Sequence, residues 1–275
     1  MESKIDIVIP VKNAILSKNL SIFFTLHFLL RQKSVEIKIF IIVNSSKDKT
    51  ADYIKKQFHD KRITVIESSE KGVASARNIG AELGNAPNIL FIDDDMILPF
   101  NDTLKKTVLA SENYDFACGA LRFWTPRDWT AFIKKEDTFN SWVNILEKIS
   151  FLPLGVDRDS GYMDLTHVSF IGNYGLIKRE VYEKTKGFPV IYKGWGLEDT
   201  HYMYTLCLQK FDYKLLKESD IIVYHLNHEI NRNISFIKNL EVFQKYQIKV
   251  GIKFNEAAFF KEFDGVVPVL RKCHN

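Results

Sequence analysis

Hydrophobic positions in the first 120 residues alternate between two patterns. Short apolar runs rich in β-branched residues occupy positions 5–11, 37–43, 63–66 and 89–92, as expected of buried strands. Between these runs, apolar residues recur at helical spacing over residues 16–28, 49–58 and 73–84. Strands that alternate with helices in this way predict βαβ units with right-handed crossovers. The fold class is therefore α/β, with a mostly parallel central sheet flanked by helices.

The pattern is less regular after residue 100. We predict a helix at 101–112, a strand at 114–123, a strand and helix over 170–182, a helix at 199–210 and a strand at 221–223. The segment 124–164 holds three of the four tryptophans, and a helix near 137–149 is expected in it. Its aromatic residues are interpreted as the core of a small subdomain, with an acceptor-binding surface as the alternative.

An apolar stripe with surrounding lysines predicts one or two amphipathic helices over residues 233–263. Such a helix either covers the domain that precedes it or lies on an anionic membrane surface. The longest apolar stretch, 22–30, is too short to span a bilayer, and no targeting segment is recognised. We therefore expect a cytoplasmic protein that is at most peripheral at the membrane.

Composition narrows the possible functions only slightly. A net charge of +4 spread over 275 residues argues against nucleic-acid binding, which needs a concentrated basic face. The three cysteines, Cys118, Cys207 and Cys273, form neither a zinc pattern nor a disulfide framework, which fits a reducing compartment.

Three consecutive carboxylates, Asp93, Asp94 and Asp95, directly follow the apolar run 89–92. Open α/β sheets bind ligands outside the carboxyl ends of their strands. Because Mg²⁺ and Mn²⁺ prefer carboxylate oxygen, the triplet predicts a divalent-cation site. The alternative is a solvated acidic turn.

Two other polar features follow predicted strands. Asn44 and Asp48 lie past the second strand, where they could hydrogen-bond a base or ribose, although Asp48 could equally cap the next helix. The small residues of the run 71–80 would let the backbone approach a ligand, and Arg77 in this run could pair with a phosphate or an acid. The alternative for Arg77 is a solvated residue on a helix surface.

Taken in order, the stretches 10–13, 43–50, 71–72, 76–80 and 91–95 resemble the nucleotide-sugar domain of family 2 glycosyltransferases of the GT-A fold. The resemblance covers about the first 120 residues and implies a bound nucleotide, usually UDP. It implies that Asp95 binds the metal that grips the diphosphate, with Asp93 in support. Asn44 departs from the acidic residue common in the family. The residues implied at the nucleotide are Pro10, Val11, Asn13, Asn44, Asp48, Lys71, Arg77, Asp93 and Asp94.

Residues 194–199, Gly-Trp-Gly-Leu-Glu-Asp, resemble the acceptor-side signature of galactosyl- and N-acetylgalactosaminyltransferases with the GT-A fold. This resemblance implies that Asp199 deprotonates the acceptor hydroxyl and that Glu198 binds a donor or acceptor hydroxyl. Trp195 could then stack on a sugar ring. The resemblance also implies that a downstream histidine, His225 or His228, completes the metal site. The alternative for Glu198 and Asp199 is simple capping of the helix that follows.

The expected protein is a metal-dependent glycosyltransferase that uses Mn²⁺ or Mg²⁺. It moves a hexose or N-acetylhexosamine from a UDP-sugar to a glycan, a lipid-linked sugar or a peptide, with inversion. We expect a GT-A domain over residues 1–230, with a nucleotide-sugar half at 1–120 and an acceptor half at 121–230. Residues 231–275 would form a C-terminal helical extension with possible membrane contact.

Three alternatives to this function stay open. The acceptor-side signature also occurs in retaining N-acetylgalactosaminyltransferases, which need no such base. A sugar-phosphate nucleotidyltransferase would share the sheet and the metal, but the first strand is followed by no Gly-rich phosphate loop. A non-catalytic member that only binds carbohydrate or protein would fit Asn44, whereas residues 93–95 and 198–199 argue against it.

Overall fold

The computed structural model describes residues 3–15, 21–118, 121–124, 172–194, 196–216, 221–226 and 234–250. Its larger sheet has seven strands in the order β3-β2-β1-β4-β8-β6-β9. The bounds of these strands are β1 (Ser3–Val11), β2 (Val35–Asn44), β3 (Ile63–Ser68), β4 (Asn88–Ile92), β6 (Phe116–Cys118), β8 (Tyr174–Lys178) and β9 (Tyr213–Leu215).

Four of these strands form a continuous parallel block. β1 pairs in parallel with both β2 and β4, and β2 pairs in parallel with β3. β8 runs antiparallel between β4 and β6, and β6 is parallel to β9. The predicted α/β architecture with a mostly parallel sheet is therefore confirmed.

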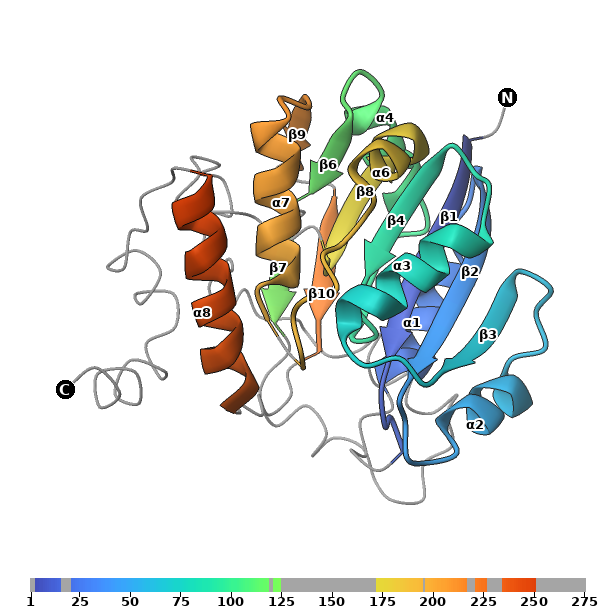
Figure 1. The fold of residues 1–275 in the computed structure, drawn as a ribbon. Helices are drawn as coiled ribbons and strands as arrows, with labels where there is room; N and C mark the ends of the chain where they lie inside the picture. The colour runs from blue at the N-terminus through green and yellow to red at the C-terminus, as the bar shows by residue number, and fades with distance from the viewer. Residues whose placement is uncertain are drawn as a thin grey trace.

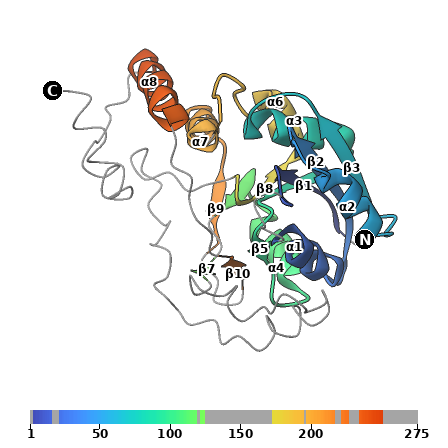
Figure 2. The ribbon, with the colours of Figure 1, turned by 90° about the horizontal axis from the view of Figure 1, so that it is seen from below.

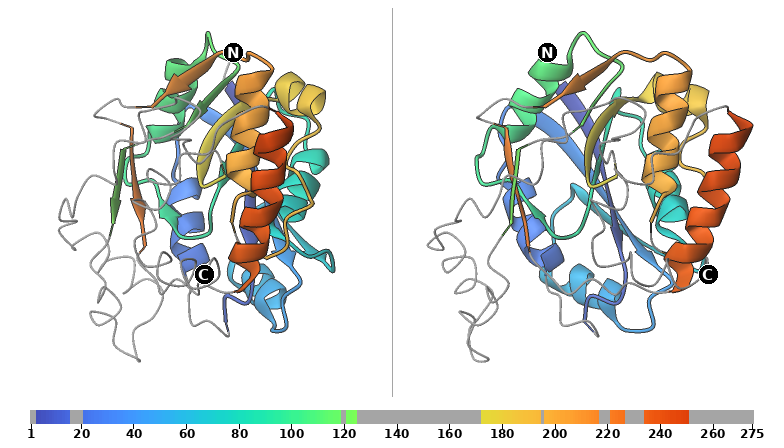
Figure 3. Two further views of the ribbon diagram at one scale, coloured as in Figure 1. Left: turned by 60° about the vertical axis from the view of Figure 1, so that its left-hand side comes forward. Right: turned by 90° about the vertical axis from the view of Figure 1, so that its left-hand side faces the viewer.

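Helices cover both faces of this sheet (Figure 1). Seen from below, α3, α6 and α7 lie on one face, and α1 and α4 lie on the other (Figure 2). α8 lies outside α7, and the two helices run side by side in both views of Figure 3. The helices are α1 (Ser21–Leu30), α2 (Thr50–Gln57), α3 (Val73–Leu83), α4 (Thr103–Ser111), α6 (Arg179–Thr185), α7 (Glu198–Leu208) and α8 (Ile234–Lys249).

The strand predicted at 114–123 is wrong as a single element. Its first part is β6 of the large sheet, and its second part is β7 (Leu121–Trp124). β7 belongs to a three-stranded sheet of order β5-β10-β7, with β5 (Met96–Ile97) and β10 (Ile222–His225). The break arises because β6 pairs with β8 and β9, whereas β7 pairs with β10. The helix expected near 137–149 lies outside the described residues.

α3 packs very closely on the sheet. Gly80 makes this possible, because a Cβ at this position would overlap the side chain of Val8 on β1. Ala76, one turn earlier, is fully buried. Close packing brings the buried face of α3, including Arg77, up to the sheet.

A buried ion pair joins the beginning of the chain to α6. Arg179 Nη2 lies 2.7 Å from Oδ2 of Asp6, whose side chain is 1% exposed. The backbone N–H of Ala86 donates to the same oxygen at 2.7 Å, and Arg179 also donates to the carbonyls of Ala81 and Ala86. One carboxylate thus connects β1, the turn after α3 and the start of α6.

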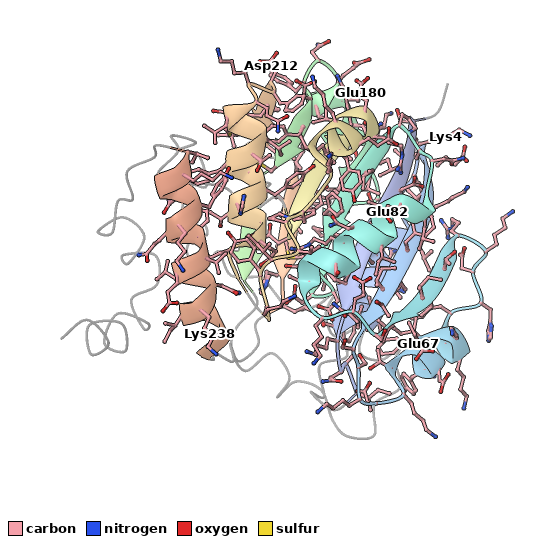
Figure 4. All side chains as sticks on the ribbon, in the orientation of Figure 1. Lys4, Glu67, Glu82, Glu180, Asp212 and Lys238 are labelled. Atoms are coloured by element: carbon pink, nitrogen blue, oxygen red, sulfur yellow. The ribbon has the colours of Figure 1, made fainter. Side chains whose placement is uncertain are left out.

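The apolar stripe of α8 faces the protein. Leu240 and Phe243 are buried, and the Phe243 ring makes an edge contact with Tyr204 of α7 at 5.4 Å between centroids. Lys238 (Figure 4) is exposed, as are Lys245 and Lys249. Over residues 234–250 the stripe therefore covers the preceding domain, which was one of the two alternatives. None of the helices that the structure describes is both long enough and apolar enough to cross a bilayer.

Candidate active site

The candidate site lies where the parallel strands end. The carboxyl ends of β1, β2 and β4 share one edge of the sheet, and α3 and α7 both begin at that edge (Figure 1). Segments from positions near 13, 44, 72, 93 and 198 are therefore brought together, as the α/β pattern predicts.

Two predicted nucleotide residues, Asn13 and Asp48, fasten neighbouring loops to each other. Asn13 Oδ1 accepts the Lys47 N–H at 2.7 Å, and Asp48 Oδ2 accepts the Ile15 N–H at 3.1 Å. Asp48 Oδ1 also accepts the N–H of Thr50, the first residue of α2. The N-cap of α2 is Lys49, which has no side-chain cap, so Asp48 lies one residue before the cap position and its contact with Thr50 belongs to the turn ahead of the helix. These side chains fix the loops after β1 and β2, and their nucleotide role stays a prediction.

Asn44 orients the turn before α3. The residue is 6% exposed, and Nδ2 donates to the carbonyl of Gly72. A carboxylate at this position could not donate that hydrogen bond, which gives a structural reason for the departure from the family pattern. Among the other residues predicted at the nucleotide, Pro10 is half-buried, Lys71 is exposed and the Val11 side chain lies in the core. Val11 therefore has only its main chain to offer a ligand.

Arg77 bridges the two acidic motifs. Nη2 donates to Asp93 Oδ1 at 3.0 Å, and Nη1 donates to Glu198 Oε1 at 2.9 Å. The Arg77 side chain is 4% exposed, and its guanidinium lies 5.2 Å from the centre of the Phe188 ring. The resemblance implies that Arg77 lies near the nucleotide. The structure directs both ends of the guanidinium to carboxylates, which agrees with the predicted pairing with an acid and makes the solvated alternative wrong. The place of Arg77 near the nucleotide stays a prediction.

Gly172 leaves the room that this guanidinium occupies. A Cβ at position 172 would lie 2.5 Å from Cζ of Arg77. Any larger residue there would displace the bridge. The sequence carries no sign of this requirement, because Gly172 lies 95 positions from Arg77.

Burial and charge shift the pKa of two carboxyls upward. Desolvation raises the pKa of Asp93 to about 6, although the positive charge of Arg77 opposes the shift. Desolvation together with the charge of Glu198 raises the pKa of Asp199 to about 7. A carboxylate with a pKa near neutrality is well matched to taking a proton at physiological pH.

Glu198 and Asp199 occupy the first turn of α7, where the helix dipole favours anions. Asp199 Oδ1 accepts the Thr200 N–H at 2.7 Å, which fixes that oxygen. Glu198 Oε2 is buried and has no hydrogen-bond partner among the described residues. An acceptor oxygen of this kind is costly unless a ligand supplies the donor.

Asp95 lies beside His225, 130 residues further along the chain. His225 Nε2 is 3.3 Å from Asp95 Oδ2, and both side chains are largely buried. The short sheet explains the proximity, because β10 pairs with β5 and the Leu226 N–H donates to the Asp95 carbonyl at 2.9 Å. Asp94 is half-buried, and its carbonyl accepts the Thr25 hydroxyl. Trp195 and His228 lie outside the described residues.

The Asp95 carboxylate has the donor chemistry for Mn²⁺ or Mg²⁺, and the imidazole of His225 favours the transition metal of the two, Mn²⁺. Within the described ranges, no cluster of three or more His, Cys, Asp or Glu side chains forms a metal cage. Ions of this kind are commonly held by one or two protein ligands, water and substrate phosphates rather than by a complete cage. A two-donor set therefore fits a metal that is shared with a phosphorylated ligand.

One polar residue near the site gave no signal in the sequence. Asn239 of α8 hydrogen-bonds to Lys193 and Gly196, on either side of position 195. The sequence pattern predicts that an Asn in an amphipathic helix lies on the solvent-exposed face, because it does not show which loop packs against the helix.

Comparisons with known proteins agree with this architecture. The family model described as Glycosyl transferase family 2 matches residues 6–185, and a model described as the N-terminal domain of galactosyltransferase matches residues 156–229. An uncharacterized glycosyltransferase of Rickettsia bellii (strain RML369-C) is 29% identical over 115 residues. That match covers 42% of this chain and 16% of the Rickettsia protein.

Two solved structures share the fold at low identity. S. aureus TarS 1–349 in complex with UDP-GlcNAc is 16% identical, with a TM-score of 0.56 over 83% of this chain and 60% of that one. The mannosyltransferase PcManGT from Pyrobaculum calidifontis, in complex with GDP-Man and Mn²⁺, is 15% identical, with a TM-score of 0.54 over 88% of this chain and 65% of that one. The chain thus spans under two thirds of both structures, and the likeness shows the GT-A fold.

The family model covers well over half of the 275 residues, and it includes the Asp93–Asp95 triplet, Arg77 and the strands that position them. The parallel block β3-β2-β1-β4 with carboxylates at its carboxyl edge agrees with that match. The chain belongs to glycosyl transferase family 2 and has the GT-A fold.

Proposed function

We propose that this chain is a glycosyltransferase that moves a hexose or N-acetylhexosamine from a UDP-sugar to an acceptor hydroxyl, with inversion. The Arg77 bridge carries the proposal. It holds Asp93, at the end of β4, and Glu198, beside Asp199, in one buried site. Donor-binding and proton-accepting carboxylates are thereby side by side, as transfer between two substrates requires. The complexes of TarS with UDP-GlcNAc and of PcManGT with GDP-Man support a nucleotide-sugar donor, and the first of them supports UDP.

At the donor end, Asp95 and His225 would hold Mn²⁺ or Mg²⁺, with Asp93 in support. When bound, the ion would supply positive charge to the departing diphosphate. Asp95 is 5% exposed, so its carboxylate works in a partly desolvated environment where such charge interactions are strong. The presence of Mn²⁺ in the PcManGT complex supports this assignment.

At the acceptor end, Asp199 acts as the general base. The acceptor oxygen attacks the anomeric carbon, the bond from that carbon to the diphosphate oxygen breaks, and the hydroxyl proton moves to Asp199. Because the Thr200 N–H fixes Oδ1, we assign the proton to Oδ2. Glu198 keeps Oε1 on Arg77, which leaves Oε2 to accept a hydrogen bond from a donor or acceptor hydroxyl.

A donor screen tests this function directly. The chain is incubated with UDP-Glc, UDP-Gal, UDP-GlcNAc or UDP-GalNAc, with Mn²⁺, with Mg²⁺ or with EDTA, and released UDP is measured. We expect UDP release from at least one donor, and only with a divalent ion. Pyrophosphate release from UTP and a sugar phosphate would instead indicate a nucleotidyltransferase. Donor binding without any turnover would indicate a non-catalytic member. NMR of the product anomer distinguishes inversion from retention.

Replacing Asp95 by Ala should remove the effect of metal on UDP binding. In titration calorimetry, Mn²⁺ should tighten UDP binding to the wild type at least about tenfold, because the ion joins the phosphates to the site. The variant should bind UDP equally with and without Mn²⁺. Asp52→Ala, at an exposed position of α2, is the matched control and should behave as the wild type. A full Mn²⁺ effect in Asp95→Ala would contradict the metal assignment.

A further inference from the structure

A side chain from α8 holds the loop that leads into α7. Asn239 is 2% exposed, and its amide makes two hydrogen bonds to residues 192–197, here called the pre-α7 loop. Oδ1 accepts the Lys193 N–H at 3.1 Å, and Nδ2 donates to the Gly196 carbonyl at 3.0 Å. A single amide therefore fastens the pre-α7 loop at two points, three residues apart.

The backbone of the pre-α7 loop needs such support. Among the described residues of this loop, 192–194 and 196–197, three have positive φ: Gly194 at 81°, Gly196 at 98° and Leu197 at 75°. Glycine adopts this region without penalty, but for leucine it costs on the order of 1–2 kcal/mol. Leu197 is nevertheless buried and directly precedes Glu198 and Asp199. Strained conformations of this kind persist only where surrounding contacts determine them.

α8 also reaches the beginning of the pre-α7 loop indirectly, through His201 of α7. The Tyr192 hydroxyl lies 2.8 Å from His201 Nδ1, and the His201 ring stacks on Tyr246 of α8 with 3.6 Å between centroids. Burial lowers the pKa of His201 to about 4, so this ring is neutral at physiological pH. Through His201 of α7, α8 therefore reaches Tyr192 as well as residues 193 and 196.

We propose that Asn239 is a positioning residue for the acceptor-side carboxylates. By fixing the pre-α7 loop, it sets where α7 begins and therefore where Glu198 and Asp199 meet Arg77 and the substrates. This inference rests on the proposed function for its catalytic consequence. The inference makes α8 part of the candidate active site. The apolar stripe of α8 alone indicates only a helix that packs on the preceding domain. Misplacing a reacting group by about 1 Å can slow a reaction on the order of 100-fold.

The test compares Asn239→Ala and Asn239→Asp with Glu241→Gln, an exposed position on the same helix. Hydrogen–deuterium exchange reports on residues 192–197, because the Lys193 amide is protected by Asn239 itself. In Asn239→Ala we expect faster exchange there and unchanged exchange in β1 to β4. UDP affinity with Mn²⁺ should stay within about twofold, while turnover of the preferred UDP-sugar falls at least about tenfold. Glu241→Gln should match the wild type in every measurement.

Asn239→Asp measures the same contact a second time, through the hydrogen bond to Gly196 alone. It keeps the acceptor for Lys193 but sets a buried carboxylate oxygen against the Gly196 carbonyl, so exchange and turnover should change at least as much as in Asn239→Ala. Unchanged exchange at 192–197 with normal turnover would overturn the proposal. So would faster exchange throughout β1 to β4, which would make Asn239 a general stabiliser. A wild type that turns over no UDP-sugar would refute the proposed function instead, while the exchange data would still judge the loop contact.

Discussion

Asp199→Asn should lose about 10²- to 10⁴-fold in transfer rate while it binds UDP as tightly as the wild type. The amide keeps the shape of the side chain and its place at the start of α7, but it cannot take the acceptor proton. In the wild type, kcat/KM should rise with pH up to about 7 and then level off, because burial raises the pKa of the Asp199 base to about 7. The variant should lack that dependence.

Stability separates this effect from misfolding. A carboxyl whose pKa is raised on folding destabilises the native state when it is ionised. This penalty is full above the folded pKa, and it disappears as the pH falls from the folded pKa to the unfolded pKa. Removing the ionisable group should therefore leave Asp199→Asn at least as stable as the wild type at pH 8, as measured by urea unfolding. Asp52→Asn, exposed on α2, serves as the control for both rate and stability. A variant that keeps more than about a tenth of the wild-type rate would refute the base assignment.

Arg77→Met should cause the largest loss of stability of any substitution considered in this protein. Removing one partner of a buried ion pair commonly costs about 3–5 kcal/mol, because the remaining charge loses its compensation. Here the buried guanidinium compensates both Asp93 and Glu198. We expect a loss of about 3 kcal/mol or more at pH 8, measured by urea unfolding.

The loss should shrink as pH falls. Arg77 lowers the pKa values of Asp93 and Asp199, which are still raised to about 6 and 7, so its removal would raise both further. The extra penalty is full above the variant's own, higher pKa values, and it is lost as the pH falls from those values through the wild-type values of about 6 and 7. At pH 5.5 the variant should therefore lie closer to the wild type than at pH 8.

Arg62→Met is the matched control for this substitution. Arg62 pairs with Asp60 at 2.7 Å, but both side chains are about one third exposed, so its loss should cost about 1 kcal/mol or less. Equal losses for the two arginine variants, or a loss in Arg77→Met that does not vary with pH, would contradict a compensating role for Arg77.

The elements that sequence patterns predict well here are the long ones. The apolar run at 5–11 became β1, and the alternation of strands and helices up to residue 92 was correct because each period is set by local burial. The strand at 114–123 failed because the choice between two sheets depends on distant partners. β5 and β9, with two and three residues, are too short to carry a period.

The candidate site divides in the same way. The place of Asp93 and Asp95 followed from the strand that precedes them, since ligands bind at the carboxyl ends of parallel strands. The contact between Arg77 and Glu198 spans 121 residues and depends on how α3 and α7 pack, which no local pattern records. Asn239 was missed for the same reason. The roles assigned to Asp95, His225 and Asp199 in metal binding and catalysis stay predictions until they are tested.

The Asp6–Arg179 pair limits how the chain can be divided for separate expression. A truncated protein that ends before residue 179 would keep Asp6 within β1 but lack the guanidinium that balances it. The Asp6 carboxylate, 1% exposed, would then be a buried charge without compensation and would destabilise β1, which lies between β2 and β4 in the parallel block. The first 120 residues carry most of the motifs predicted to bind the nucleotide-sugar, but we do not expect them to fold as a separate module. Useful boundaries for expression lie beyond α6.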